Sequence, residues 1–231
     1  MLFLIMLIII SFVLLLQLPS IWIKRVYKEY NYSRDDIIGS GGQFAKHLIN
    51  KNSMHEVEVL EHQTSNFYDH KKKIIYLSKD IFNQHSVTSI TIASHEFSHA
   101  KQAHEKNPLF LIRNFFQIFL FYARFVMIVI FFGSLVAGFL LGQRWLLSIS
   151  ILCYVLPGIA ELMLSILNLP LEWDASFKRA HPLIINSRYL PDDDDGKIKK
   201  ILFAALLTYV AAALSNLLSL VRTSPFARIR R

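Results

Sequence analysis

The stretch SHEFSHA, residues 94–100, places His95, Glu96 and His99 close together in a chain that has 9 His in 231 residues. On a helix, residues four apart lie on one face, so both imidazoles can bind the same ion. Glu96 lies about 100° further round and can reach a water on that ion without binding the ion itself. Zinc lowers the pKa of such a water toward about 7, and the carboxylate accepts its proton as it attacks a carbonyl. The H-E-x-x-H spacing therefore predicts His95 and His99 as metal ligands and Glu96 as the catalytic base of a zinc hydrolase.

The alternative is a chance arrangement of polar residues on an exposed helix face. The neighbouring residues argue against it, because Ile90, Ile92, Ala93, Phe97 and Ala100 make the helix mostly apolar. Such a helix is buried, and a buried imidazole needs a partner. The apolar surroundings therefore favour the metal site.

A catalytic zinc ion usually takes a third protein ligand and a water. His104 is the nearest candidate in the sequence. The extended metzincin pattern needs Gly and His at positions that hold Gln102 and Glu105 here, so the chain does not turn back at this point. His104 is therefore interpreted as an exposed histidine at a helix end.

The other candidates for the third ligand are the downstream carboxylates Glu161, Glu172 and Asp174. Glu161 lies inside an apolar run, where a charge is costly and is usually functional, although it can also be a paired structural residue. Glu172 follows that run, and Pro170 is well placed to begin a helix. On the residues alone, all three carboxylates stay open as the third ligand.

Four apolar runs separate the polar parts of the chain, in which 53% of residues are hydrophobic. Residues 1–23 carry no charge and show neither a basic start nor a small-residue cleavage site, so they predict an uncleaved membrane anchor. The other runs cover 109–141, 146–169 and 201–221. The sequence therefore predicts a multi-pass protein of the lipid bilayer.

The extended polar region between the first two runs has mixed periodicity. An amphipathic helix is expected in 41–52, a strand around Val57 and Val59, and a second strand over 73–77 after a turn-like TSNFYDH. A further helix would begin after Ser86 and stop before Pro108. The predicted fold class is a mainly α membrane protein with a small α+β zincin-like catalytic segment, in which about four hydrophobic helices accompany a short β-hairpin.

These boundaries divide the chain into five segments. The predicted segments are an N-terminal anchor (1–23), a catalytic segment (24–108), a two-span hairpin (109–169), a third-ligand helix with a polar loop (170–200), and a C-terminal hydrophobic helix with a basic tail (201–231). The acidic run at 192–195 lacks a Glu at the spacing of a calcium-binding loop, so it is interpreted as a solvated loop that caps a helix.

The charge and cysteine content exclude other classes. The net charge of +8 comes mainly from basic residues that flank the apolar runs, where they suit lipid headgroups. No nucleic-acid recognition motif is present, so no nucleic-acid partner is expected. The single Cys153 excludes an intrachain disulfide and a thiolate metal cluster. Metal chemistry in this chain must therefore use His and carboxylate ligands.

Three stretches, HEFSHAKQ, LPLEWDAS and ALLTYVAAAL, resemble the signature stretches of the YugP-type neutral zinc metallopeptidases, a family of membrane-bound bacterial enzymes. GSGGQFAKHLI and YDHKKKIIYLS resemble that family's soluble segment, so the resemblance covers nearly the whole chain. It implies one Zn²⁺ per chain, with His95, His99 and Glu172 as ligands and Glu96 as the base. The resemblance to the wider gluzincin group is looser, because Ser176 stands where that group has an orienting Asp, which leaves Asp174 as a candidate for that role.

Two spans between His99 and Glu172 return the chain to its starting side, so the three ligands can share one ion. Basic residues near the span ends are more numerous on that side, which predicts an active site on the cytoplasmic face of a bacterial inner membrane. The expected substrates are peptides or membrane proteins, and the expected role is the quality control of membrane proteins. The alternatives are a non-catalytic zinc-binding membrane scaffold, which has no need of Glu96, and a transporter subunit, which would need more intramembrane ionisable residues.

Arg179 is a candidate transition-state stabiliser. It lies seven positions beyond Glu172, which on an α-helix returns it to within about 20° of the same face. A guanidinium near the metal would stabilise the oxyanion formed during peptide hydrolysis. Pairing with a carboxylate such as Asp174, or contact with a lipid headgroup, are the alternatives.

Overall fold

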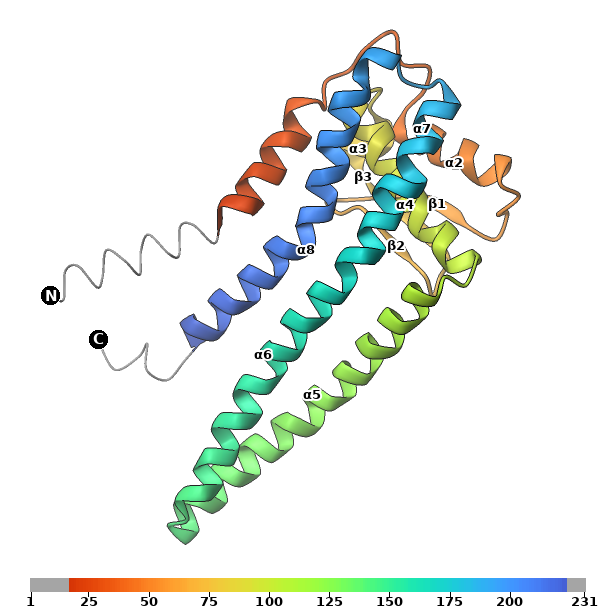
Figure 1. The fold of residues 1–231 in the computed structure, drawn as a ribbon. Helices are drawn as coiled ribbons and strands as arrows, with labels where there is room; N and C mark the ends of the chain where they lie inside the picture. The colour runs from red at the N-terminus through yellow and green to blue at the C-terminus, as the bar shows by residue number, and fades with distance from the viewer. Residues whose placement is uncertain (1–16, 224–231) are drawn as a thin grey trace, which may run out of the picture. The chain divides into compact units, whose positions relative to one another are not determined.

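The computed structural model describes residues 17–223 of the chain, shown in Figure 1. Most of the predicted anchor at 1–23 and the end of the basic tail therefore lie outside the described residues. The chain forms two compact units. One, called here the site unit, contains Pro19–Leu111 and Leu169–Thr208. The other, the hairpin unit, contains Ile112–Asn168 together with the described residues at 17–18 and 209–223.

Helix α2 (Gly41–Lys51) begins the site unit's core with the amphipathic pattern expected for residues 41–52. Ser40 caps it in a reciprocal capping box, in which the Ser40 hydroxyl and the Gln43 side chain each bind the other's backbone N–H. Its apolar face buries Phe44 and Leu48. At Gly41 a Cβ atom would lie 2.8 Å from the carbonyl oxygen of Ser89, so glycine permits the close approach of α2 to the next helices.

The sheet consists of β1 (Glu58–His62), β2 (Phe67–Asp69) and β3 (Ile74–Ser78) in the order β1-β3-β2. The predicted hairpin of the first and last of these strands is wrong, because they pair in parallel. The segment interpreted as a turn contains β2, which forms an antiparallel hairpin with β3. The chain therefore reverses direction twice between β1 and β3, and two reversals restore the original direction.

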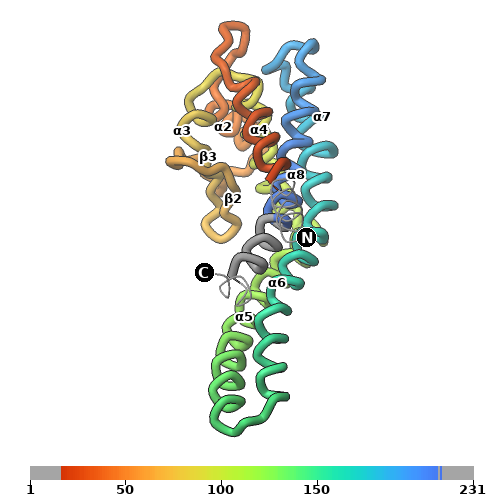
Figure 2. Tube along the Cα trace, turned by 90° about the vertical axis from the view of Figure 1, so that its left-hand side faces the viewer, coloured from red at the N-terminus to blue at the C-terminus, as the bar shows by residue number. Residues whose placement is uncertain are grey.

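Helix α4 (Val87–His104) follows the short α3 (Lys79–Asn83) and has Ser86 as its N-cap, as predicted. It ends at His104, and Pro108 begins the next helix instead of stopping this one. Nearly all of α4 is buried, because the sheet packs on one side of it and η1 and α7 on the other (Figures 1 and 2). Helix α2 also packs against α4, which makes α4 the central element of the site unit.

The two long apolar helices are α5 (Pro108–Leu141) and α6 (Arg144–Trp173). In the described part of the chain, two helical stretches are long and apolar enough to cross a membrane: Pro108–Leu141 and the continuous stretch Arg144–Ser187. The structure thus bears out two of the four hydrophobic helices as candidate spans. Within the hairpin unit, Arg124 forms an ion pair with Glu161, and the Ser134 and Ser150 hydroxyls are 2.7 Å apart.

After α6 the chain continues as a π-helical segment, η1 (Asp174–Ala180), and then as α7 (His181–Ser187), η2 (Asp192–Asp194) and α8 (Asp195–Thr223). The prediction of a solvated loop at 192–195 is wrong for Asp194, which is buried. Asp194 is 1% exposed and accepts from Arg34 Nη1 at 2.6 Å and from Lys197. Asp195 pairs with His181 at 2.6 Å. These carboxylates therefore fasten the start of α8 to other elements of the site unit.

Candidate metal centre

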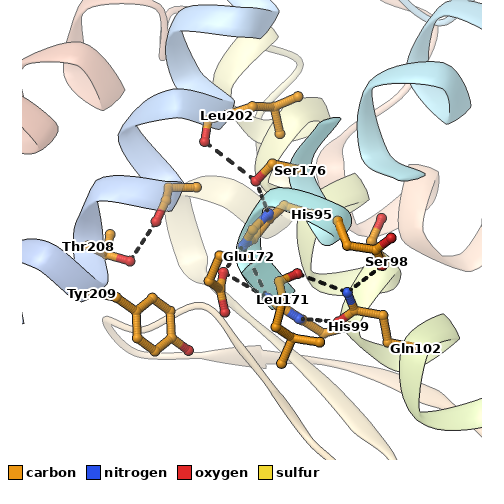
Figure 3. A network of polar contacts seen from close by, with 12 residues as sticks. His95, Ser98, His99, Gln102, Leu171, Glu172, Ser176, Leu202, Thr208 and Tyr209 are labelled. Atoms are coloured by element: carbon orange, nitrogen blue, oxygen red, sulfur yellow. Dashed lines mark hydrogen bonds and ion pairs between the residues drawn. The ribbon is translucent and has the colours of Figure 1, made fainter. Parts of the chain in front are cut away.

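Three side chains from two distant parts of the sequence meet inside the site unit (Figure 3). His95 and His99 come from successive turns of α4, and their Nε2 atoms are 3.2 Å apart. Glu172, at the end of α6, places Oε2 3.4 Å from Nε2 of His95 and 3.3 Å from Nε2 of His99. The ligand atoms all lie within 4.8 Å of one another, so a single ion can contact all three.

The environment of Glu172 shows that these residues fit a metal ion. Glu172 is fully buried, and neither carboxylate oxygen has a hydrogen-bond partner among the described residues. A buried carboxylate without a partner is costly, and a cation between it and the two imidazoles removes that cost. Two imidazole nitrogens and a carboxylate oxygen are the donors that catalytic zinc uses with one position left open. The cluster therefore suits Zn²⁺.

His99 is oriented by Gln102, three residues further along α4. The Gln102 amide nitrogen donates to Leu171 O at 3.0 Å and to Asp174 Oδ2 at 2.9 Å, so its oxygen faces His99 Nδ1, 3.0 Å away. Nδ1 of His99 must therefore carry the proton and donate it to Gln102. The lone pair is then on Nε2, the atom that faces Glu172.

His95 is oriented by Ser176, which lies in η1. The Ser176 hydroxyl is 3.1 Å from His95 Nδ1 and makes a longer contact of 3.5 Å to Leu202 O. Since the hydroxyl donates to the carbonyl, it accepts from Nδ1, and Nε2 of His95 again keeps its lone pair for a metal. Ser176, which stands where the gluzincin group has an orienting Asp, therefore contacts His95 directly. Asp174 acts on the other imidazole, that of His99, through Gln102.

Glu96 is buried beside the cluster, with 7% of its surface exposed. The backbone N–H of Tyr68 in β2 is near enough to the Glu96 carboxylate to lower its pKa slightly. Burial raises the pKa of Glu96 above its usual range, although the neighbouring His95 and His99 act in the opposite direction. The carboxylate expected to act as a base therefore lies in the part of α4 that packs near strand β2.

The remaining candidate ligands have partners elsewhere. His104 is half-exposed and its Nδ1 is 2.8 Å from Glu56 Oε1. Glu161 forms its ion pair with Arg124 within the hairpin unit, which supports a structural role for both. The structure does not include either residue in the cluster around Glu172.

Arg179 contacts two carboxylates. Its Nε donates to Asp174 and its Nη1 to Glu105, each at 2.6 Å. The segment is π-helical rather than α-helical as assumed, and a π-helix brings residues five apart together, which matches Asp174 and Arg179. Arg179 therefore holds the carboxylate that binds Gln102, and its role at the transition state stays a prediction.

Gln102 is the orienting residue that sequence reasoning missed. Gln102 lies three residues after His99, and this spacing on a helix brings two side chains together. The spacing alone could therefore have indicated Gln102 as a partner of His99. It was noted only as a departure from the metzincin pattern, because its partners Leu171 and Asp174 come from a distant segment.

The chain is similar to known proteins over most of its length. A family model described as "Putative neutral zinc metallopeptidase" matches residues 5–227. The "Putative membrane protease YugP" of Bacillus subtilis (strain 168) is 28% identical over 202 residues, which cover 87% of this chain and 86% of that protein. No solved structure matches the chain.

Proposed function

The chain belongs to the neutral zinc metallopeptidase family whose model spans it, and from this we propose that it is a membrane-bound zinc metalloendopeptidase. The observation that carries the proposal is the buried His95–His99–Glu172 cluster with Glu96 beside it. A purely structural site has no need of a further buried carboxylate next to its ligands. The combination of three ligands and an adjacent base therefore favours hydrolysis over metal storage.

Each residue of the site has a distinct task in this proposal. When bound, zinc would supply a Lewis acid that polarises the substrate carbonyl and makes water a nucleophile near neutral pH. His95, His99 and Glu172 hold the ion. Glu96 accepts the proton of the attacking water on its carboxylate and delivers it to the leaving amine. Gln102 and Ser176 keep the two imidazoles in the tautomer that exposes Nε2.

The membrane part of the proposal is supported by two apolar helices long enough to cross a bilayer and by the name of the Bacillus subtilis relative. We infer a multi-pass protein with its active site on the cytoplasmic face, because basic residues flank the spans on that side. Peptides and membrane proteins are the proposed substrates, with quality control as the proposed role.

Zinc analysis of the purified full-length protein tests the metal site. About one zinc per chain is expected for the wild type, with loss of zinc in His95→Ala, His99→Ala and Glu172→Ala. His104→Ala is the matched control, because this histidine also lies on α4 but contacts Glu56 at the surface. Glu161→Ala should likewise keep its zinc. Full occupancy in the three ligand variants would rule out the proposed site.

Cleavage of casein or of a membrane-protein substrate tests the reaction. Glu96→Gln should abolish cleavage while zinc stays bound, because the amide cannot accept the proton. Wild-type turnover in this variant would remove Glu96 as the base. A wild type that binds zinc but cleaves neither substrate would favour the alternative of a non-catalytic zinc-binding scaffold or transporter subunit.

A further inference from the structure

The turn between β2 and β3, called here the lysine turn, presents three consecutive lysines, Lys71, Lys72 and Lys73, whose side chains are all exposed (Figure 2). Asp69 fixes this turn, because its Oδ1 atom accepts from the backbone N–H of Lys71 at 3.0 Å and of Lys72 at 3.1 Å. Lys73 has a φ of 57°, a left-handed conformation with which the chain enters β3. The backbone therefore holds three positive charges together at one end of the hairpin.

The lysine turn lies against the first residues of α5. The rings of His70 and Phe110 are 5.9 Å apart and nearly perpendicular, and Phe110 is 4% exposed. Asn107 fixes the beginning of α5, because its Oδ1 atom accepts from the N–H of Leu109 and its own N–H donates to Gln102 O in α4, each at 2.9 Å. The lysines are therefore held where the chain leaves α4 and enters the first long apolar helix.

The length of α5 indicates where this end of the helix lies in a membrane. Its 34 residues make a helix about 51 Å long, whereas a bilayer is about 30 Å thick in its hydrocarbon core and about 40–45 Å with its headgroups. A spanning α5 therefore reaches the headgroup layer at both ends. The contact between His70 and Phe110 brings the lysine turn to the level of one of these layers.

We propose that the lysine turn is a lipid-recognition surface, in which Lys71 and Lys72 bind the anionic headgroups of the bilayer that α5 crosses. The inference rests on the proposed membrane insertion of α5 and adds a binding surface to it. A lysine near an anionic bilayer surface contributes about a fivefold gain in affinity. An acidic protein segment has the same charge, but the contact with the beginning of α5 favours the bilayer, because it places the lysines beside the membrane.

The lipid contact also positions the candidate site. Strand β2 leads into the lysine turn and packs against α4, the helix that carries His95, Glu96 and His99. A turn bound to headgroups therefore holds this part of α4 close to the membrane surface. The segments of membrane proteins that emerge from the bilayer are within reach of such a site.

Lysine modification of the full-length wild-type protein in lipid nanodiscs tests the proposal. A water-soluble amine-reactive reagent should modify Lys71 and Lys72 at least about fivefold more slowly in nanodiscs of phosphatidylcholine with phosphatidylglycerol than in phosphatidylcholine alone. Lys79 is the matched control, because it is also exposed but lies at the other end of β3, about 20 Å from Lys73. Its rate should be the same in both lipids, and peptide mass spectrometry measures each lysine separately.

Ionic strength supplies a second readout on the same samples. In about 1 M salt the Debye length falls to about 3 Å, so phosphatidylglycerol should no longer protect Lys71 and Lys72. Protection that survives this salt would overturn the proposal, because it would come from burial instead of from attraction between charges.

Equal rates in the two lipids at low salt would likewise overturn the proposal. Protection that needs an added polyglutamate peptide instead of phosphatidylglycerol would assign the turn to a protein segment and overturn it too. A chain that does not enter the nanodiscs would contradict the proposed membrane insertion and this inference together. None of these readouts depends on turnover, so a protected turn in an inactive wild type would support the lipid contact and contradict the proposed hydrolysis.

Discussion

The imidazoles of the two candidate ligands are each held at Nδ1 by a different kind of side chain. Gln102 binds His99 and is itself held by Asp174, while Ser176 binds His95 with only a long contact to a backbone carbonyl behind it. The His99 arrangement is the more constrained, because both ends of the Gln102 amide are satisfied. Such partners fix ring orientation and tautomer before a metal binds.

We therefore expect Gln102→Ala to bind zinc more weakly by about tenfold to a hundredfold. Without the amide, His99 can rotate or carry its proton on Nε2, where it cannot bind a metal. Competition with a chromogenic chelator measures the affinity. Ser98→Ala is the control, because Ser98 is equally buried on α4 but its hydroxyl donates to Ser94 O, away from both imidazoles. Equal affinities for the two variants would contradict the orienting role.

Arg179 has two testable roles that differ in what they predict. If it stabilises the transition state, Arg179→Ala should lower kcat by about tenfold or more with zinc affinity unchanged. If it acts through its contact with Asp174, zinc affinity should fall together with activity, since Asp174 holds Gln102. Measuring kcat and zinc affinity on the same preparation separates these roles. If kcat and zinc affinity are both unchanged in Arg179→Ala, Arg179 has neither of these roles.

At the scale of elements, α4 can hold the candidate metal ligands in a buried site because its neighbours cover nearly all of it. The close packing of α2 against α4 depends on Gly41, where a Cβ would meet the backbone carbonyls of Ile81 and Ser89. Backbone atoms cannot turn aside as a flexible side chain can. The position of α4 is therefore sensitive to a single methyl group at this contact.

Gly41→Ala should lower the free energy of unfolding by about 1–3 kcal/mol, because the added methyl group overpacks the contact. Gly196→Ala in the first turn of α8 is the control, since a Cβ there meets nothing within 4 Å. That change should be neutral or slightly stabilising, as Ala is the better helix former. Thermal unfolding of both variants in the same detergent measures the difference, and equal melting temperatures would contradict the packing argument.

At the scale of the whole molecule, the proposed metal site and the proposed membrane spans are linked by the path of the chain. In the sequence, α5 and α6 lie between the candidate ligands on α4 and Glu172. The chain therefore passes through both long helices before it reaches the candidate third ligand. Two crossings return the chain to one side, whereas a single crossing would separate the ligands by a bilayer. A metal site made of all three residues therefore requires that α5 and α6 both cross the membrane, or that neither does.

The single Cys153 makes this topology testable by labelling. In a Cys153→Ser background, Gln143→Cys between the two long helices should react with a membrane-impermeant maleimide in intact bacterial cells. Lys71→Cys, in the turn between β2 and β3, should react only after the cells are permeabilised. The reverse pattern would place the active site outside the cytoplasm, and reaction of both in intact cells would contradict the membrane hairpin.

The sequence by itself determined the features that depend on local periodicity and spacing. The amphipathic α2, the Ser86 cap and the placement of two ligands on one helix follow from residues near one another in the chain. Glu172 was reached only with the resemblance to a family, because three carboxylates were open on the residues alone. The family itself is shown by a match over most of the chain.

Only the tertiary structure decided how distant segments meet. The parallel pairing of β1 with β3 could not be seen, because the short β2 between them has the composition of a turn. The π-helical turns of η1 changed the direction of Arg179, since a shift of one residue in hydrogen bonding rotates every later side chain. Gln102 and Ser176 owe their positions to partners far away in sequence. Their positions depend on packing, which no local pattern records.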